Sequence, residues 1–131
     1  MLEVWTAQYR YNGPDRLDIT AKSKDPLGKY FAPTWDLVLR YKDKSISEEE
    51  YTQEYLELMH NVYRKYPNVW RQLLSRKRVV LVCFCRPNTF CHRILLARIL
   101  EKLGATYKGE IILTKGELNG SKRCSKRITK I

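Results

Sequence analysis

The residues whose types could do chemistry are concentrated in one stretch, from residue 83 to residue 93. Three of the four cysteines, one of the two histidines and two arginines lie there: Cys83, Cys85, Arg86, Cys91, His92 and Arg93. Thiolates are nucleophiles and metal ligands, imidazole exchanges protons near neutral pH, and guanidinium groups bind phosphate with two donors at once. The combination indicates a thiol site, an anion site or a metal site.

The local pattern predicts a strand, a turn and a helix around these side chains. Residues 79–83 form an apolar run typical of a buried strand, Pro87 and Asn88 mark a turn, and residues 94–103 have helical spacing. Gly104 suits a helix C-terminus, and residues 105–113 read as another strand. Such a unit has two parallel strands with a right-handed crossover, and ligands bind at the carboxyl ends of its strands.

The upstream sequence predicts two strands and three helices. Residues 2–9 and 17–20 read as strands, and a long loop covers residues 21–33. Thr34 should cap a helix to residue 41, Ser47 and Glu50 should form a capping box, and Asn68 should cap a helix to residue 74. Helical spacing predicts a buried stripe (Tyr51, Tyr55, Leu58, Val62, Tyr66), and the tryptophans read as core (Trp5, Trp35, Trp70).

Length and pattern together indicate one domain. We expect an α/β, Rossmann-like fold over residues 1–113, with a mostly parallel sheet flanked by helices. Residues 114–131 read as a basic C-terminal tail. No apolar run is long enough to cross a membrane and no signal-peptide pattern begins the chain, so we expect a cytoplasmic protein without a membrane partner.

An anion is the ligand class that the turn favours. The helix after the turn should present unpaired amides and the positive end of its dipole. Arg86 and Arg93 can add donors suited to phosphate. We expect Asp18, Thr20 and Ser23 to complete the site from a neighbouring strand end.

The same field favours a thiolate. Cys91 is the best candidate because it stands at the helix start beside His92, which would act as base or acid; Cys85 is second. The stretch has no glycine-rich cradle, and its spacing differs from the cysteine, five residues, arginine loop of phosphatases. The predicted catalytic residues are therefore Cys91, His92 and Cys85, with the reaction left open.

Structural roles for the cysteines remain as alternatives. A zinc ion would take its ligands from this stretch (Cys83, Cys85, Cys91, His92), with Cys124 or His60 available as a further ligand. The sequence lacks the paired C-x-x-C motifs that are usual in structural zinc sites. Disulfides Cys85–Cys91 and Cys83–Cys124 are both conceivable. Cys83 alone reads as a small buried hydrophobe. Phe84 and Phe90 read as core or lid residues rather than as platforms on which bases stack. We expect no cofactor and no bound metal.

Charge points to the class of partner. The formal net charge is +11 and the pI about 9.6, which favours a nucleotide or nucleic acid. A basic surface that is only solvated is the alternative that charge alone leaves open. An alternative is a nucleic-acid-binding viral protein without enzymatic activity, using the tail and the basic residues 75–78, with structural cysteines. The oligomeric state is left open.

Several segments resemble the DUF488 family of unknown function. They are Leu81-Val-Cys-Phe-Cys85, Phe90-Cys-His-Arg93, Leu95-Leu-Ala97, Gly109-Glu110, Leu17-Asp-Ile-Thr20, Phe31-Ala-Pro33, the 46–59 helix and Trp70. The compact form is similar to members carried by phages and other viruses, because the connection between the first two strands is too short for a helix. The resemblance implies a Rossmann-like domain with its site at the Cys-His-Arg turn, and it implies no particular reaction.

Overall fold

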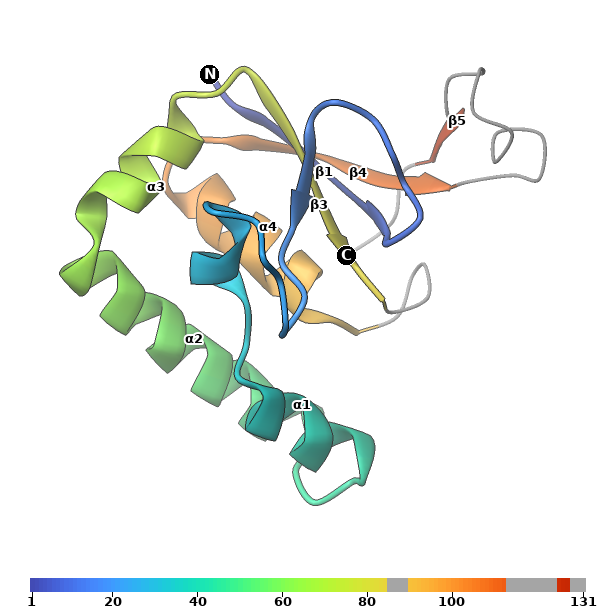
Figure 1. Ribbon diagram of the computed structural model, residues 1–131, viewed down its shortest axis with the longest axis vertical. Coiled ribbons are helices and arrows are strands. Elements are labelled where there is room, and N and C mark those ends of the chain that lie inside the picture. The colour runs from blue at the N-terminus through green and yellow to red at the C-terminus, as the bar shows by residue number, and fades with distance from the viewer. Residues whose placement is uncertain (85–89, 113–124, 128–131) are drawn as a thin grey trace.

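The computed structural model describes residues 1–84, 90–112 and 125–127 (Figure 1). Its sheet has the order β2-β3-β1-β4-β5, with β1 to β4 parallel and β5 antiparallel to β4. The strands are β1 (Glu3–Gln8), β2 (Arg16–Asp18), β3 (Arg78–Cys83), β4 (Thr106–Ile112) and β5 (Ser125–Arg127). The helices are η1 (Gly28–Phe31), α1 (Trp35–Lys42), α2 (Glu48–Lys65), α3 (Pro67–Leu74) and α4 (His92–Lys102). The expected single α/β domain with a mostly parallel sheet is confirmed.

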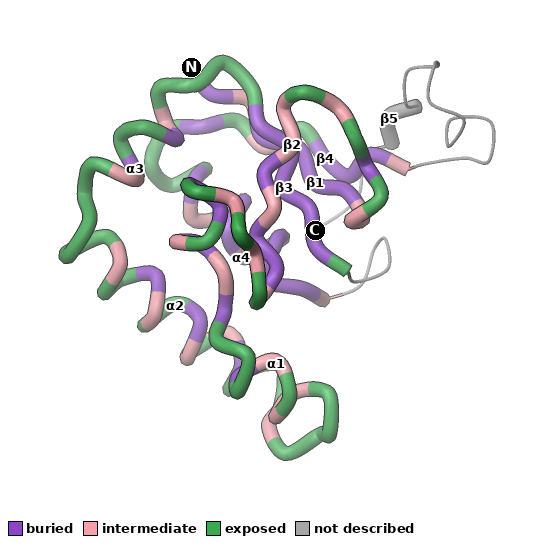
Figure 2. Tube along the Cα trace, in the orientation of Figure 1, coloured by how far each residue is buried: buried purple, intermediate pink, exposed green. Residues whose placement is uncertain are grey.

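The two faces of the sheet are covered differently. Val4 of β1 belongs to the larger core cluster, which includes buried residues of all five helices. Its neighbour Trp5 belongs to a smaller cluster on the opposite face, whose described members come from β1, β3, β4 and the segment after β1 (Trp5, Ala7, Tyr11, Val80, Val82, Ile111). The buried positions follow the strands through the centre of the molecule (Figure 2). Strand alternation thus separates a helix-covered face from a face without described helices.

The short connection between β1 and β2 still forms a parallel crossover. Both strands pair with β3 in parallel register, so β1 and β2 run in the same direction. The chain returns through residues 9–15, which can span at most about 25 Å when extended. Tyr11 anchors this return because its ring is buried and its hydroxyl donates to Asp15 Oδ1 at 2.7 Å. The two strands therefore run in the same direction although no described helix joins them.

Helix α2 begins as predicted, and its buried side differs in part. Ser47 Oγ accepts from the Glu50 amide at 3.1 Å, and Glu50 Oε1 accepts from the Ser47 amide at 2.9 Å. Tyr51, Tyr55 and Met59 are buried. The predicted burial of Tyr66 is wrong, since it is 43% exposed beyond the helix end, where α3 begins.

Other expectations need correction. Pro67 occupies the first turn of α3 and Tyr66 its N-cap, so Asn68 does not cap that helix. Trp35 is 45% exposed at the start of α1, with Lys22 Nζ lying 4.4 Å from its ring centroid, and is no core residue. The β3–α4–β4 unit is parallel as expected, but β1 lies between its strands. No described helix is long and apolar enough to cross a membrane.

Candidate thiol and imidazole site

The candidate site lies at the carboxyl edge of the sheet, where β3 ends and α4 begins. Cys83 is the last residue of β3, and Cys91 is the N-cap of α4, whose side chain makes no capping hydrogen bond. The predicted residues Cys85 and Arg86 lie outside the described residues. The strand and the helix therefore bring Cys83 and Cys91 together although the turn between them is not described.

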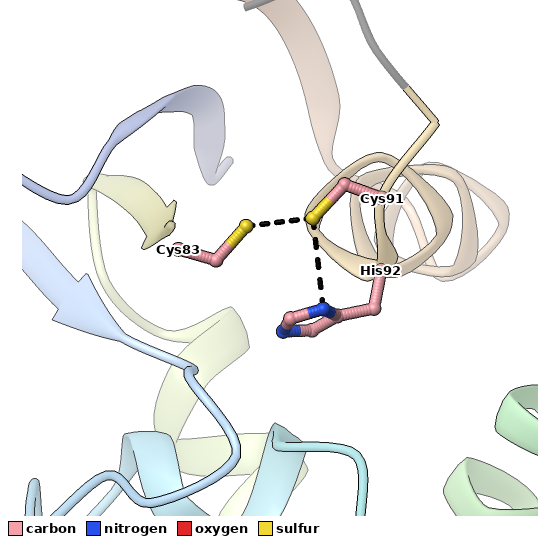
Figure 3. A group of neighbouring side chains, drawn as sticks. All are labelled: Cys83, Cys91 and His92. Carbon is pink, nitrogen blue, oxygen red and sulfur yellow. Dashed lines mark hydrogen bonds between the residues drawn. The ribbon is translucent and has the colours of Figure 1, made fainter. Parts of the chain in front are cut away.

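Two thiols and one imidazole form the centre of the site (Figure 3). Cys83 Sγ and Cys91 Sγ are 2.6 Å apart, and Cys91 Sγ is 3.6 Å from His92 Nδ1. All three side chains are buried, with exposed fractions of 5% or less. Cys83 is buried as expected, but its sulfur takes part in a polar cluster and is not simply a small hydrophobe. The candidate disulfides Cys85–Cys91 and Cys83–Cys124 both involve residues outside the described part.

The orientation of His92 is set by a backbone carbonyl. His92 Nε2 lies 2.6 Å from the carbonyl oxygen of Ile19, which follows β2. A carbonyl only accepts, so Nε2 carries the proton and Nδ1 of the neutral ring faces Cys91 Sγ as an acceptor. Burial lowers the pKa of His92 to about 4, partly opposed by the bond to Ile19. The imidazole is therefore neutral near pH 7 and presents a lone pair to the thiol.

Arg93 lies behind the sulfurs in a buried ion pair. Its Nη2 and Nε donate to Glu110 at 2.9 and 3.2 Å, its Nη1 donates to Cys83 Sγ at 2.9 Å, and neither charged side chain has exposed surface. Burial acts to lower the pKa of Arg93, but the attraction of Cys83, Cys91 and Glu110 outweighs it and raises that pKa. None of these contacts directs Arg93 to the surface, where an incoming phosphate would have to meet it.

Sequence reasoning did not assign a site role to Glu110 or Thr6. Thr6 and Glu110 are register partners on β1 and β4. Thr6 Oγ1 donates to Glu110 Oε1 at 2.5 Å and is 2.7 Å from the Tyr107 hydroxyl. Both residues are fully buried, so strand pairing makes the polar contacts that hold the acceptor of Arg93. The signal that could have indicated this role is the position of Glu110 between Gly109 and Ile111 in β4.

The residues predicted from the second strand are joined to one another by hydrogen bonds. Asp18 Oδ1 accepts from the Thr20 amide at 2.9 Å and from its hydroxyl at 2.7 Å. Ser23 Oγ donates to the Asp18 carbonyl at 2.7 Å, and a side chain at Gly28 would clash with that oxygen. These bonds shape the loop that presents Ile19 to His92. Their predicted contact with an anion stays a prediction.

The two phenylalanines of the stretch have different surroundings. Phe90 is half-buried, with ring centroids 5.4 Å from those of Tyr41 and Tyr51, as expected of a core or lid residue. Phe84 is 70% exposed, so its expected place in the core is wrong, whereas its role as a lid residue stays a prediction. It follows the last residue of β3 and stacks on Tyr9 with a centroid distance of 4.3 Å.

Comparison with known proteins agrees with the resemblance in the sequence. No curated protein and no solved structure matches this chain. A family model described as the Active DUF488-N3 subclade matches residues 1–104, which include Cys83, Cys91, His92 and Arg93. Because this match covers most of the chain, the protein belongs to the DUF488 family.

Proposed function

We propose that the protein binds a phosphate-bearing ligand, a nucleotide or nucleic acid, where β3 ends and α4 begins, and that Cys91 acts on it. The observation that carries the proposal is the fixed orientation of His92. Its Nε2 is held by Ile19 and its Nδ1 faces Cys91 Sγ at 3.6 Å. A base within reach of a thiol is the arrangement that nucleophilic cysteines use.

The surroundings of Cys91 support a thiolate. During the reaction, the proton would move from Cys91 Sγ to Nδ1 of the neutral His92, so that the thiolate and the imidazolium coexist only transiently. Two further influences favour the negative charge: the positive end of the α4 dipole and the buried Arg93 guanidinium next to Cys83. The thiolate would then attack an electrophilic atom of the ligand and form a bond to it while the bond from that atom to a leaving group breaks, and the leaving group would take the proton from His92 Nδ1.

The ligand class rests on charge and position. The net charge of +11 attracts polyanions, and the first turn of α4 suits a phosphate. In this proposal Asp18, Thr20 and Ser23 border the ligand, and Cys85 and Arg86 remain candidates to contact it. We place this activity in the cytoplasm, of the host cell if the protein is viral.

Site-resolved alkylation tests the proposal. The native protein is treated with iodoacetamide between pH 5 and 10, and modification of each cysteine is followed by mass spectrometry. Cys91 should react with an apparent pKa below the ordinary thiol value of about 8.5, and His92→Gln should slow the reaction because it removes the proton acceptor at Nδ1. A phosphate-bearing ligand such as a nucleotide or a short oligonucleotide should slow the reaction. A Cys91 that reacts only after denaturation would overturn the proposal.

A specific geometry favours a second candidate. Cys83 Sγ, Cys91 Sγ and a ring nitrogen of His92 lie within 4.8 Å of one another and could hold a metal ion. Zinc-bound histidines commonly donate their other ring nitrogen to a carbonyl, as His92 does to Ile19. The protein would then be a nucleic-acid-binding protein without enzymatic activity, using its basic surface and tail, with cysteines that serve the structure.

Metal analysis separates the two candidates. The second predicts about one zinc per chain after purification without chelator, and alkylation of Cys83 and Cys91 only after zinc removal. The first predicts ready alkylation of Cys91 in protein that holds less than stoichiometric zinc. Protein without zinc whose Cys91 reacts natively would exclude the second candidate.

A further inference from the structure

An exposed aromatic side chain lies one residue beyond the site. Phe84 follows Cys83, the last residue of β3, and it stacks on Tyr9, which packs against the smaller cluster on the face away from the helices. Its ring is 70% exposed and stacks on Tyr9 with an interplanar angle of 25°. The ring therefore has one face on Tyr9, while most of its surface remains open to solvent.

A cation with a fixed position, the Arg16 guanidinium, lies over the Tyr9 ring of this aromatic pair. The Arg16 guanidinium carbon lies 4.4 Å from the centroid of the Tyr9 ring. Arg16 cannot swing away easily because Nε donates to the Tyr11 carbonyl at 2.8 Å and Nη2 to the Tyr9 carbonyl at 3.0 Å. Arg16, Tyr9 and Phe84 form what we call the aromatic column, which is held in place before any ligand binds.

We propose that the outer face of Phe84 is a stacking platform for an unpaired nucleobase. Bases stack on exposed aromatic rings in proteins that bind single strands, and such proteins combine these rings with positive charge. The chain supplies both, with a net charge of +11 and Arg16 at the base of the column. This inference rests on the proposed function and adds that the phosphate-bearing ligand carries a free base.

The column and the sulfur cluster lie within reach of one ligand. Cys83 and Phe84 are adjacent, so their Cα atoms are about 3.8 Å apart. Cys83 Sγ faces Cys91 at the start of α4 (Figure 3), and Phe84 stacks on Tyr9, which packs against the cluster on the other face of the sheet. A nucleotide crossing this edge can set its base on Phe84 and its phosphate near the first turn of α4.

Binding of two matched polymers tests the platform. Fluorescence anisotropy compares a labelled single-stranded oligothymidylate with an abasic strand of equal length, which has the same phosphates and no bases. Phe84→Leu, which keeps apolar bulk and removes the aromatic face, should weaken oligothymidylate binding by at least about 5-fold and leave the abasic strand unaffected. Phe84→Trp should retain or improve the binding of oligothymidylate.

A matched control and a competitor complete the design. Tyr63→Leu removes another exposed aromatic ring, on α2, and should change neither affinity. Competition by thymidine monophosphate distinguishes a nucleotide from a strand as the source of the base, because a nucleotide site would be blocked at far lower concentrations than a strand site. Circular dichroism verifies that each variant is folded.

The outcomes are separable. Unchanged oligothymidylate binding by Phe84→Leu, or equal weakening of both polymers, would overturn the platform. Wild-type protein that binds both polymers equally well would also overturn the platform while leaving the proposed phosphate site standing. No affinity for either polymer or for the nucleotide would refute the platform together with the ligand class of the proposed function.

Discussion

Replacing His92 by glutamine should make the stability of the protein less sensitive to acid. Burial lowers the pKa of His92 from 6.5 to about 4 in the folded protein, against a partial opposing effect of the Ile19 carbonyl. In the unfolded chain the ring recovers its ordinary pKa of about 6.5. Between these values the unfolded state binds a proton that the native state does not, so the native state loses stability as the pH falls.

The size of the effect follows from this difference in pKa. The contribution is fully present above about pH 6.5, declines as the pH falls, and is lost below about pH 4. The wild type should lose about 2 kcal/mol between pH 7 and pH 5, and about 3 kcal/mol by pH 4, through His92 alone. Glutamine does not titrate, and its amide can still donate to the Ile19 carbonyl.

Urea unfolding of both proteins at pH 7, 6, 5 and 4 measures this contribution. A chelator is present throughout, so that no metal competes with protons for the ring. Acid effects of other groups are common to both proteins and largely cancel in the difference between their free energies of unfolding. The free energy of unfolding of the wild type minus that of His92→Gln should be about 2 kcal/mol smaller at pH 5 than at pH 7. A difference that stays constant with pH would refute a buried, neutral His92.

Three more predictions concern other contacts of the fold. Arg93→Ala should lower the free energy of unfolding by about 3–5 kcal/mol, because it leaves the carboxylate of Glu110 buried without its cation. A loss below about 1 kcal/mol in urea unfolding would contradict the buried ion pair. Ser47→Ala should lower the free energy of unfolding by about 1 kcal/mol in the same assay, because it removes the capping box of α2. An unchanged free energy of unfolding would argue against the capping box. Diamide should oxidise Cys83 and Cys91 to a disulfide, detected as a linked peptide pair by mass spectrometry; linkage of other pairs alone would count against their contact.

The order of the strands could not be predicted as well as the strands themselves. The turn after β1 and the capping box of α2 are local signals, so most elements were placed close to their observed bounds, whereas η1 and β5 were not predicted. The position of β1 between β3 and β4 depends on pairings between distant segments, because Val4 pairs with Val79 of β3 and with Tyr107 of β4, both more than 70 residues away. No local pattern encodes which strand takes the central place.

The site was predictable to the extent that its residues are neighbours in sequence. Cys91 and His92 were found because both stand at the start of one helix. The role of Glu110 appears only when the register of β1 and β4 sets it beside Thr6 and opposite Arg93. The exposure of Phe84 was missed because an apolar residue after a buried strand reads as core, whereas here the strand has already ended.

The pairing of Arg93 with Glu110 changes how this edge of the sheet can attract an anion. The pair is neutral as a unit and has no exposed surface, so it gives little long-range attraction to a phosphate. That attraction must come from the first turn of α4 and from basic residues outside the pair, such as Arg16 in the aromatic column. Arg93 instead directs Nη1 to Cys83 Sγ, beside Cys91. We therefore infer that Arg93 positions and charges the thiol cluster, while other groups meet the ligand.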